Sequence, residues 1–256
     1  MVARTELVTP EPARALGALL DVPVPDLERS GLPLLWHWLY LLDRPAQADL
    51  GQDGHPVRGA VPEPPGPGRR RMWAGGRVRR SGALLCGEPA TRSSAVRSVL
   101  EKNGRSGPLT FIVVGHQIHQ RGRLVVDEEQ DLVYRAGSSL AAPADGEPVP
   151  AAEGEWRIDV SPTLLFRFSA LTYNAHRIHY DRDYARDVEG YPGLLTHGPL
   201  QALAMAEAAR AREIPGDLFE YRLVSPLFDH QGMIVTPNAV RDLYGRQTAT
   251  GRLSRA

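Results

Sequence analysis

The sequence predicts an α+β protein in which helix is followed by antiparallel strands in both halves of the chain. Residues 11–43 place apolar side chains at helical spacing, and Pro45 ends that pattern. Residues 109–120 and 124–135 are rich in β-branched and aromatic side chains, and only three residues separate them, which predicts a β-hairpin. Residues 198–213 have the most regular helical pattern of the chain.

Weaker patterns predict the remaining elements. The stretch 136–154 is rich in Ala, Pro, Gly and Ser and has no periodicity, so we expect a linker between the halves 1–135 and 155–256. Residues 51–68 are crowded with proline and glycine and are expected to form a loop. We further expect short helical turns in an ordered loop at 171–188, a helix or strand at 162–169, and strands at 73–78, 84–87, 219–224, 233–235 and 239–247.

Charge and composition exclude several classes of protein. The 30 basic and 30 acidic side chains balance, so no bulk electrostatic attraction draws the chain to nucleic acid or to an anionic membrane. The longest apolar run, residues 32–42, is too short to span a bilayer and is expected to be a packed helix. The single cysteine, Cys86, permits no internal disulfide, and no signal peptide is visible. We therefore expect a cytoplasmic protein that binds neither nucleic acid nor membrane, and a solvated face for the arginines at 69–71, 77, 79 and 80.

Residues 168–181 concentrate the side chains that carry chemistry. They include His176 and His179 together with an asparagine, an arginine and two tyrosines. A histidine that titrates near neutrality can take up a proton and return it. A third histidine, His197, precedes Gly198 at the start of the predicted helix, where unpaired backbone N–H groups can stabilise a developing negative charge. This combination predicts proton transfer beside an oxyanion-binding group, as hydration of an enoyl thioester requires.

The same segment carries a resemblance to a known family. The run from Phe168 to Asp181 (FSALTYNAHRIHYD), with Thr196-His197-Gly198 leading into the helix, resembles the MaoC-like, hotdog-fold dehydratases. It resembles most closely their two-module branch, which contains 3-hydroxyacyl-thioester dehydratases and mesaconyl- or itaconyl-CoA hydratases. The resemblance implies a double hotdog, in which two helix-wrapped antiparallel sheets form a pseudo-dimer. It assigns 1–135 to a degenerate module and 155–256 to the module with the hydratase motif.

The resemblance also implies an activity and a set of site residues. The activity is that of a hydro-lyase, an enoyl-thioester hydratase or 3-hydroxyacyl-thioester dehydratase. It acts on a small-molecule CoA or carrier thioester, with a dicarboxylic mesaconyl- or itaconyl-type substrate as one option. No metal or redox cofactor is expected, and the chain is expected to form a homodimer or a higher homo-oligomer. His179 matches the catalytic histidine, and Gly198 matches the backbone donor to the thioester oxygen. The expected substrate-binding residues are Tyr173, His176, Arg177, Tyr180 and His197.

One catalytic position departs from the family pattern. Asn174 stands where the wider family has an aspartate, and His176 stands where it has an asparagine. Asparagine can orient a water molecule but cannot accept its proton. Asn174 is therefore expected to position water, and a second base must come from elsewhere, with His176 and Asp181 as candidates.

Several other interpretations of the sequence remain open. A thioesterase of the same fold would need a carboxylate on the long helix, where Glu207 lies. A non-catalytic acyl-thioester binding protein would bind acyl-CoA without turnover. A metal-binding protein could use His176, His179 and His197 as ligands. Asn174 could serve only to cap a turn, and His179 could be a hydrogen-bonded core histidine.

Overall fold

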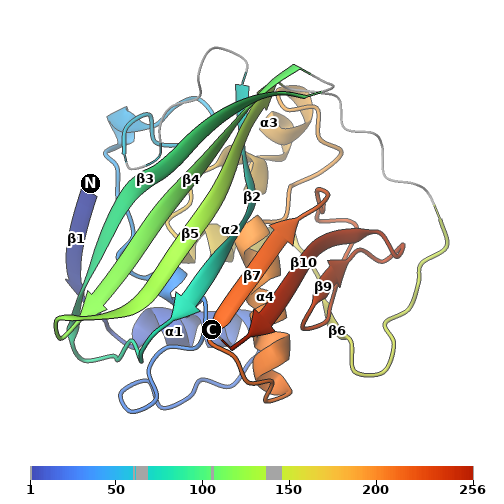
Figure 1. Cartoon of the computed structure of the whole chain (residues 1–256). Helices are drawn as coiled ribbons and strands as arrows, with labels where there is room; N and C mark the ends of the chain where they lie inside the picture. The colour runs from blue at the N-terminus through green and yellow to red at the C-terminus, as the bar shows by residue number, and fades with distance from the viewer. Residues whose placement is uncertain (1, 60, 62–68, 105–106, 137–145, 256) are drawn as a thin grey trace.

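The strands of the computed structural model, which describes residues 2–59, 61, 69–104, 107–136 and 146–255, form one antiparallel sheet. Its order is β1-β3-β4-β5-β2-β7-β10-β9-β8-β6, with β1 and β6 at the two edges (Figure 1). The strands are β1 (Val2–Leu7), β2 (Arg69–Arg80), β3 (Pro89–Gly104), β4 (Gly107–Gln120), β5 (Arg123–Ala136), β6 (Trp156–Ile158), β7 (Leu218–Leu223), β8 (Met233–Val235), β9 (Ala239–Arg241) and β10 (Gln247–Ser254).

The pairing of β2 with β7 joins the strands of the first half to those of the second. The register runs from Gly75 opposite Arg222 to Arg79 opposite Leu218. The described part of the expected linker, residues 146–154, contains no helix or strand, and 137–145 lie outside the described residues. Each half therefore supplies five neighbouring strands, while the module boundaries themselves stay a prediction.

The helices lie behind the sheet in the view of Figure 1. In the longest, α4, every residue from Leu200 to Ala209 is buried. A helix buried on all sides lies inside the core. Its two polar residues in this stretch, Gln201 and Glu207, are hydrogen-bonded, and five alanines let the surrounding elements approach closely. The helical segments are α1 (Glu11–Leu20), α2 (Pro162–Leu171), α3 (Arg182–Asp187) and α4 (Gly198–Ala211), with short 3₁₀ turns η1 (Trp36–Leu39), η2 (Gln47–Asp49) and η3 (Arg177–His179). In the described part of the chain, no helix is both long and apolar enough to cross a membrane.

The structure confirms most of the strongly patterned elements. The β4–β5 hairpin is present, and Gln120 pairs with Arg123 across a two-residue turn. Arg121 and Gly122 in that turn have φ values of 51° and 71°, the positive pair that matches the twist of a tight hairpin. The 162–169 segment is the helix α2, and the 171–188 loop contains η3 and α3 as expected.

The expected helix over 11–43 is wrong beyond Leu20. The chain leaves α1 through Asp21, which has a left-handed φ of 53°, and the prolines at 23, 25 and 33 prevent the helix from resuming. Within 32–42, only the 3₁₀ turn η1 is helical. The apolar spacing there reflects burial of an irregular segment, since Leu35, Trp36 and Leu41 are fully buried.

Two strand predictions are also wrong. Residues 84–87 form an irregular segment that ends in a turn at Cys86 and Gly87, because the Gln120 side chain takes the place of a partner strand. Its Oε1 accepts from the Leu85 N–H at 2.8 Å, and its Nε2 donates to the Leu85 carbonyl at 2.9 Å. The 239–247 segment divides into β9, a turn and β10. In that turn the Asp242 carboxylate accepts the backbone N–H groups of Tyr244 and Arg246, each at 2.9 Å.

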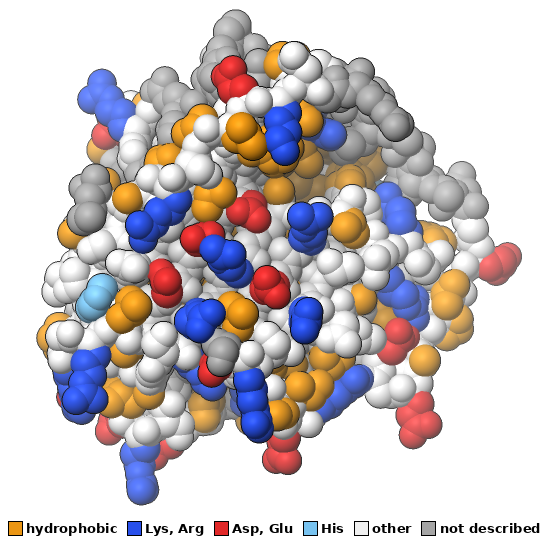
Figure 2. Space-filling model, viewed as in Figure 1, with side chains coloured by type: hydrophobic (Ala, Val, Ile, Leu, Met, Phe, Trp, Pro, Cys, Tyr) orange, Lys and Arg blue, Asp and Glu red, His pale blue; other side chains and the backbone are white. Residues whose placement is uncertain are grey.

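The outward face of the sheet mixes both signs of charge (Figure 2). A shallow groove over β2, β5, β7 and β10 is lined by basic and acidic side chains alike. Arg77 pairs with Glu129 at 2.7 Å, and Arg70 pairs with Glu189 at the same distance. The arginine cluster of the sequence is thus partly neutralised by acidic neighbours.

A buried carboxylate organises the interior of the first half. Glu128 accepts hydrogen bonds from the Trp38 indole at 2.8 Å and from Gln130 at 2.7 Å, and lies 3.0 Å from His37 Nε2. Burial alone would raise the pKa of Glu128, but these bonds and the nearby histidines lower it to about 2.

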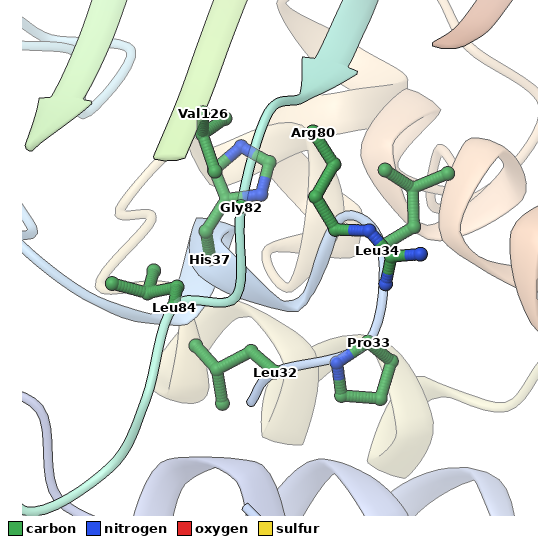
Figure 3. Close-up of a pocket in the computed structure, with 8 residues that line it drawn as sticks. All are labelled: Leu32, Pro33, Leu34, His37, Arg80, Gly82, Leu84 and Val126. Atoms are coloured by element: carbon green, nitrogen blue, oxygen red, sulfur yellow. The ribbon is translucent and has the colours of Figure 1, made fainter. Parts of the chain in front are cut away.

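Figure 3 shows the cavity beside His37, lined also by Arg80 and apolar side chains. Its volume of about 10 Å³ holds roughly one water molecule, so it is not a substrate pocket.

Candidate active site

The loop after α2 folds tightly and presents the motif residues. Tyr173 has a left-handed φ of 52°, which reverses the chain at the end of α2. Asn174 donates its N–H to the Ser169 carbonyl at 2.8 Å, and its Oδ1 accepts the His176 N–H at 2.9 Å. Asn174 therefore holds the turn in shape, the structural role that the sequence left open beside a catalytic one.

His179 lies on η3 with a defined tautomer. Its Nδ1 is 2.7 Å from the Leu195 carbonyl oxygen, which can only accept, so Nδ1 carries the proton and Nε2 keeps a lone pair. The residue is 7% exposed, and this burial lowers the pKa of His179 to about 4, although the bond to Leu195 opposes the shift. At neutral pH the side chain is therefore an uncharged imidazole that can accept a proton at Nε2.

His197 places that imidazole at the start of α4. The His179 and His197 rings are stacked, with centroids 3.7 Å apart and planes inclined by 18°. His197 is fully buried, and its Nε2 lies 2.8 Å from the Ser169 hydroxyl. The next residue, Gly198, begins the helix. A Cβ at Gly198 would lie 2.1 Å from Leu223 Cδ1 on β7, so a larger residue there would displace the Leu223 side chain.

Arg177 and Asp181 bind to each other rather than to the imidazoles. Their ion pair is 2.8 Å long, and the Arg177 guanidinium lies 4.0 Å from the centre of the Tyr184 ring. Asp181 also caps α3 by accepting the Tyr184 N–H at 3.0 Å. Asp181 is thus already engaged, and His176 remains as the motif's other candidate base.

Tyr180 is 44% exposed and donates to the Ala175 carbonyl, while Tyr173 is 54% exposed.

A loop from the first half, which sequence reasoning treated only as a loop, packs onto this motif. A Cβ at Gly54 would lie 1.9 Å from the Ala175 carbonyl oxygen, so the two backbones are in direct contact. The Arg177 N–H donates to the Asp53 carbonyl at 2.9 Å. His55 follows in this loop, and its ring centroid lies 3.9 Å from that of His176. The only sequence signal was the Asp-Gly-His step inside a proline- and glycine-rich stretch.

The loop adds a carboxylate–imidazole pair to the site. Asp53 Oδ2 lies 2.8 Å from His55 Nδ1, and Asp53 Oδ1 accepts the His55 backbone N–H at 2.9 Å. Burial alone would raise the pKa of Asp53, but the bonds from His55 outweigh it and lower the pKa to about 2. Burial lowers the pKa of His55, and burial with neighbouring positive charge lowers that of His176 well below its ordinary value.

The structure does not assemble the three histidines that the sequence offered as metal ligands. His197 Nε2 is engaged with Ser169, and His179 Nδ1 with Leu195. The described groups that come close enough to share an ion or a proton are instead Asp53, His55 and His176, whose polar atoms lie within 4.8 Å of one another. Within this group, Asp53 and His55 are hydrogen-bonded to each other.

Glu207 on α4 is engaged in packing. It is 3% exposed, accepts the Trp36 indole N–H at 2.8 Å and pairs with Arg210 Nε at 2.9 Å. A base for thioester hydrolysis must be free to activate water. Glu207, the carboxylate that a thioesterase would need, instead links η1 to α4 through its hydrogen bond with Trp36.

Comparison with known proteins agrees with this architecture. A solved MaoC-like dehydratase from Phytophthora capsici superposes with a TM-score of 0.67 at 14% identity, covering 100% of this chain and 95% of that one. A protein from Mycobacterium tuberculosis described as having a double hotdog fold gives a TM-score of 0.55 at 16% identity, over 97% and 92% of the two chains. The fold is therefore the double hotdog of the MaoC-like dehydratases.

Sequence comparison identifies the family. The chain belongs to the hydroxyacyl-thioester dehydratase type 2 family, whose model matches residues 35–229. It is 48% identical over 239 residues to the mesaconyl-C(4)-CoA hydratase of Chloroflexus aurantiacus, covering 89% of this chain and 84% of that protein.

Proposed function

We propose that the protein is a hydro-lyase that adds water to, or removes it from, the double bond of a 2-enoyl or 3-hydroxyacyl thioester. The observation that carries the proposal is the uncharged His179, with its lone pair on Nε2, stacked against His197 at the first turn of α4. Membership of the dehydratase family supports the same reaction.

In the hydration direction, His179 Nε2 takes a proton from water as the water oxygen bonds to the β-carbon. The displaced π-electron pair moves toward the thioester oxygen, where the Gly198 N–H at the helix terminus stabilises the negative charge. The imidazolium then returns its proton to the α-carbon, so one water is consumed and His179 is regenerated. In this scheme Asn174 holds the loop and positions the water, while Tyr173, His176, Tyr180 and His197 surround the acyl group.

One paired assay tests the reaction class. Loss of enoyl absorbance without release of thiol is the expected result on a panel of short, long and dicarboxylic enoyl-CoAs. Thiol release without loss of the double bond would assign the protein to thioester hydrolysis. Binding of acyl-CoA with neither change would assign it to the non-catalytic class.

We further propose a dicarboxylic substrate of the mesaconyl type, presented on CoA. The similarity to a mesaconyl-C(4)-CoA hydratase supports this choice. Arg71 on β2 supports it independently, because its side chain hydrogen-bonds to the uncharged Tyr134 and takes part in none of the ion pairs among the described residues. Its charge acts on His55 and His176, so the guanidinium lies near the imidazoles. A guanidinium without a carboxylate partner is suited to bind the carboxylate of a substrate.

Replacing Arg71 with methionine is expected to lower kcat/KM for mesaconyl-C(4)-CoA by about 30-fold, since a hydrogen bond to a charged group contributes roughly 2 kcal/mol. For an enoyl-CoA without the second carboxylate, kcat/KM should stay within about threefold, because that substrate makes no such bond. Arg79→Met, an exposed arginine on the same strand, is the matched control. An equal loss for both substrates would contradict the assignment of Arg71.

The pH dependence of the rate follows from the pKa of His179. Only the neutral ring can accept a proton, and burial lowers its pKa to about 4, so the base stays active at more acidic pH than a free histidine. We expect kcat/KM to remain level as the pH falls below the ordinary histidine value of about 6.5, to decline only below about pH 5 and to reach half its plateau near pH 4. Initial rates across this range, with circular dichroism at each pH, provide the measurement. A midpoint near the ordinary value would contradict the burial of His179 in the working enzyme.

Three expectations from the sequence are kept as proposals. The reaction is proposed to need no metal or redox cofactor, which elemental analysis and absorbance spectra of the purified protein test. A cytoplasmic location is proposed, to be tested by cell fractionation. A homodimer or larger homo-oligomer is proposed because β3 exposes Val99 and Leu100, at 57% and 51%, to solvent in the single chain. Light scattering measures the mass in solution.

A further inference from the structure

We propose that His55, oriented by Asp53, is a second catalytic histidine that holds the reacting water together with His179. The inference rests on the proposed hydratase function and adds to it a residue from the first half of the chain. It rests on three features of the site. His55 and His179 have the same tautomer, both rings lie close to His176, and Asn174 and Asp181 cannot act as the second acceptor for water.

The tautomer of His55 matches that of His179. In each ring Nδ1 faces an oxygen that can only accept, Asp53 Oδ2 at 2.8 Å for His55 and the Leu195 carbonyl at 2.7 Å for His179. Each ring therefore carries its proton on Nδ1 and leaves a lone pair on Nε2. A water molecule has two hydrogens to donate, and two such nitrogens can accept both.

The two rings belong to one cluster. Both lie close to the ring of His176, whose centroid is 3.9 Å from that of His55 and 5.4 Å from that of His179. A positive charge on His55 would be felt at His179, where it lowers the pKa. The His55 side chain is 20% exposed, so it is mostly buried but still in contact with solvent. The backbone contact between Gly54 and Ala175 holds this loop against the motif.

Two other polar side chains of the motif, Asn174 and Asp181, cannot serve as the second acceptor. The Asn174 Oδ1 atom is engaged by the His176 N–H, and an amide cannot take up a proton. Asp181 is bound to Arg177 and to the first turn of α3. His55 differs from both, because a carboxylate behind its ring strengthens Nε2 as an acceptor.

In the hydration step the water molecule is held by both histidines. The water donates one hydrogen to His179 Nε2 and the other to His55 Nε2, and its free electron pair points at the β-carbon. As the carbon–oxygen bond forms, the first proton moves to His179 and later to the α-carbon. The second proton stays on the new hydroxyl group, which still donates a hydrogen bond to His55 Nε2. Asp53 acts through His55 and is a positioning residue.

Two substitutions at His55 distinguish water binding from loop anchoring. His55→Asn keeps an N–H that can donate to Asp53 but has no atom near the Nε2 position. His55→Gln reaches that position with an oxygen that can accept from water but gives up the bond to Asp53. Water binding predicts that kcat falls in the order wild type, Gln, Asn. We expect the Asn variant to lose about 100-fold, with KM within about threefold. His119→Gln, at a histidine on β4 outside the site, is the control.

An Asn variant with kcat equal to or above that of the Gln variant would overturn the proposal, since a loop anchor needs only the bond to Asp53. Thermal melting of each variant identifies any that fail to fold, and His55→Ala, which has neither the donor nor the acceptor, takes the place of the Asn variant if that one fails. Absence of hydratase activity in the wild type would instead sink the proposed function, so the two failures are distinguishable.

Asp53 is tested through its dependence on His55. Asp53→Asn is expected to lower kcat about tenfold in the wild-type background and to have no further effect when His55 is already glutamine. Equal losses in both backgrounds would show that Asp53 does not act through His55. Stoichiometric zinc in the purified wild type that is absent from the His55→Asn variant would assign these residues to an ion and overturn the proposal.

Discussion

His179→Asn is expected to reduce kcat for enoyl-thioester hydration by about 1000-fold, equivalent to about 4 kcal/mol of barrier. The asparagine amide can still donate to the Leu195 carbonyl, which His179 Nδ1 contacts at 2.7 Å, so the loop keeps its anchor. It has no counterpart of Nε2, so water loses its proton acceptor. The decay of enoyl absorbance under saturating substrate measures the effect.

The same asparagine substitution at His119 on β4 provides the matched control and should leave kcat within about twofold. Melting temperatures of both variants show whether the fold is intact. A folded His179→Asn enzyme that retains more than about a tenth of the wild-type kcat would remove His179 from the chemistry.

Gly54→Ala is expected to reduce activity by about 100-fold, through the backbone rather than through a catalytic side chain. Gly54 has a φ of 86°, where an alanine costs roughly 1–2 kcal/mol. In addition, the new Cβ would lie 1.9 Å from the Ala175 carbonyl oxygen, a rigid backbone atom. The loop must therefore move away from the motif and take Asp53 and His55 with it.

Gly122→Ala separates the effect of backbone strain from the effect of the clash with the Ala175 carbonyl. Gly122 also has a positive φ, 71°, but a Cβ there meets nothing within 4 Å. It should lower the melting temperature by a few degrees, as about 1–2 kcal/mol of strain implies, and leave kcat unchanged. If the two alanine variants lost activity equally, strain alone would explain Gly54, and the contact with Ala175 would have no part in catalysis.

The strongly periodic elements and the motif could be read from the sequence because their signals are local. The β4–β5 hairpin needs alternating strands and a tight turn, and α4 needs apolar spacing after Gly198-Pro199. The candidate histidines could be named from the sequence because His176 and His179 lie in a recognisable motif and His197 directly precedes α4. The 11–43 helix failed because burial of an irregular segment produced the apolar spacing of a helix.

Other features depend on contacts between distant segments. The irregular segment at 84–87 exists because Gln120 satisfies its backbone, and the structural role of Glu207 appears only when Trp36 reaches α4. No local pattern encodes either contact, since each partner lies more than 30 residues away along the chain.

The sequence alone determined that a helix N-terminus follows a loop with histidines capable of proton transfer, because both properties reside in consecutive residues. Only the tertiary structure decided the protonation pattern of those histidines. The tautomer of His179 is set by the Leu195 carbonyl, its low pKa by burial, and its proximity to His55 by a loop more than 100 residues earlier in the chain. Tautomer, solvation and proximity are properties of the surroundings of a side chain, and folding creates those surroundings.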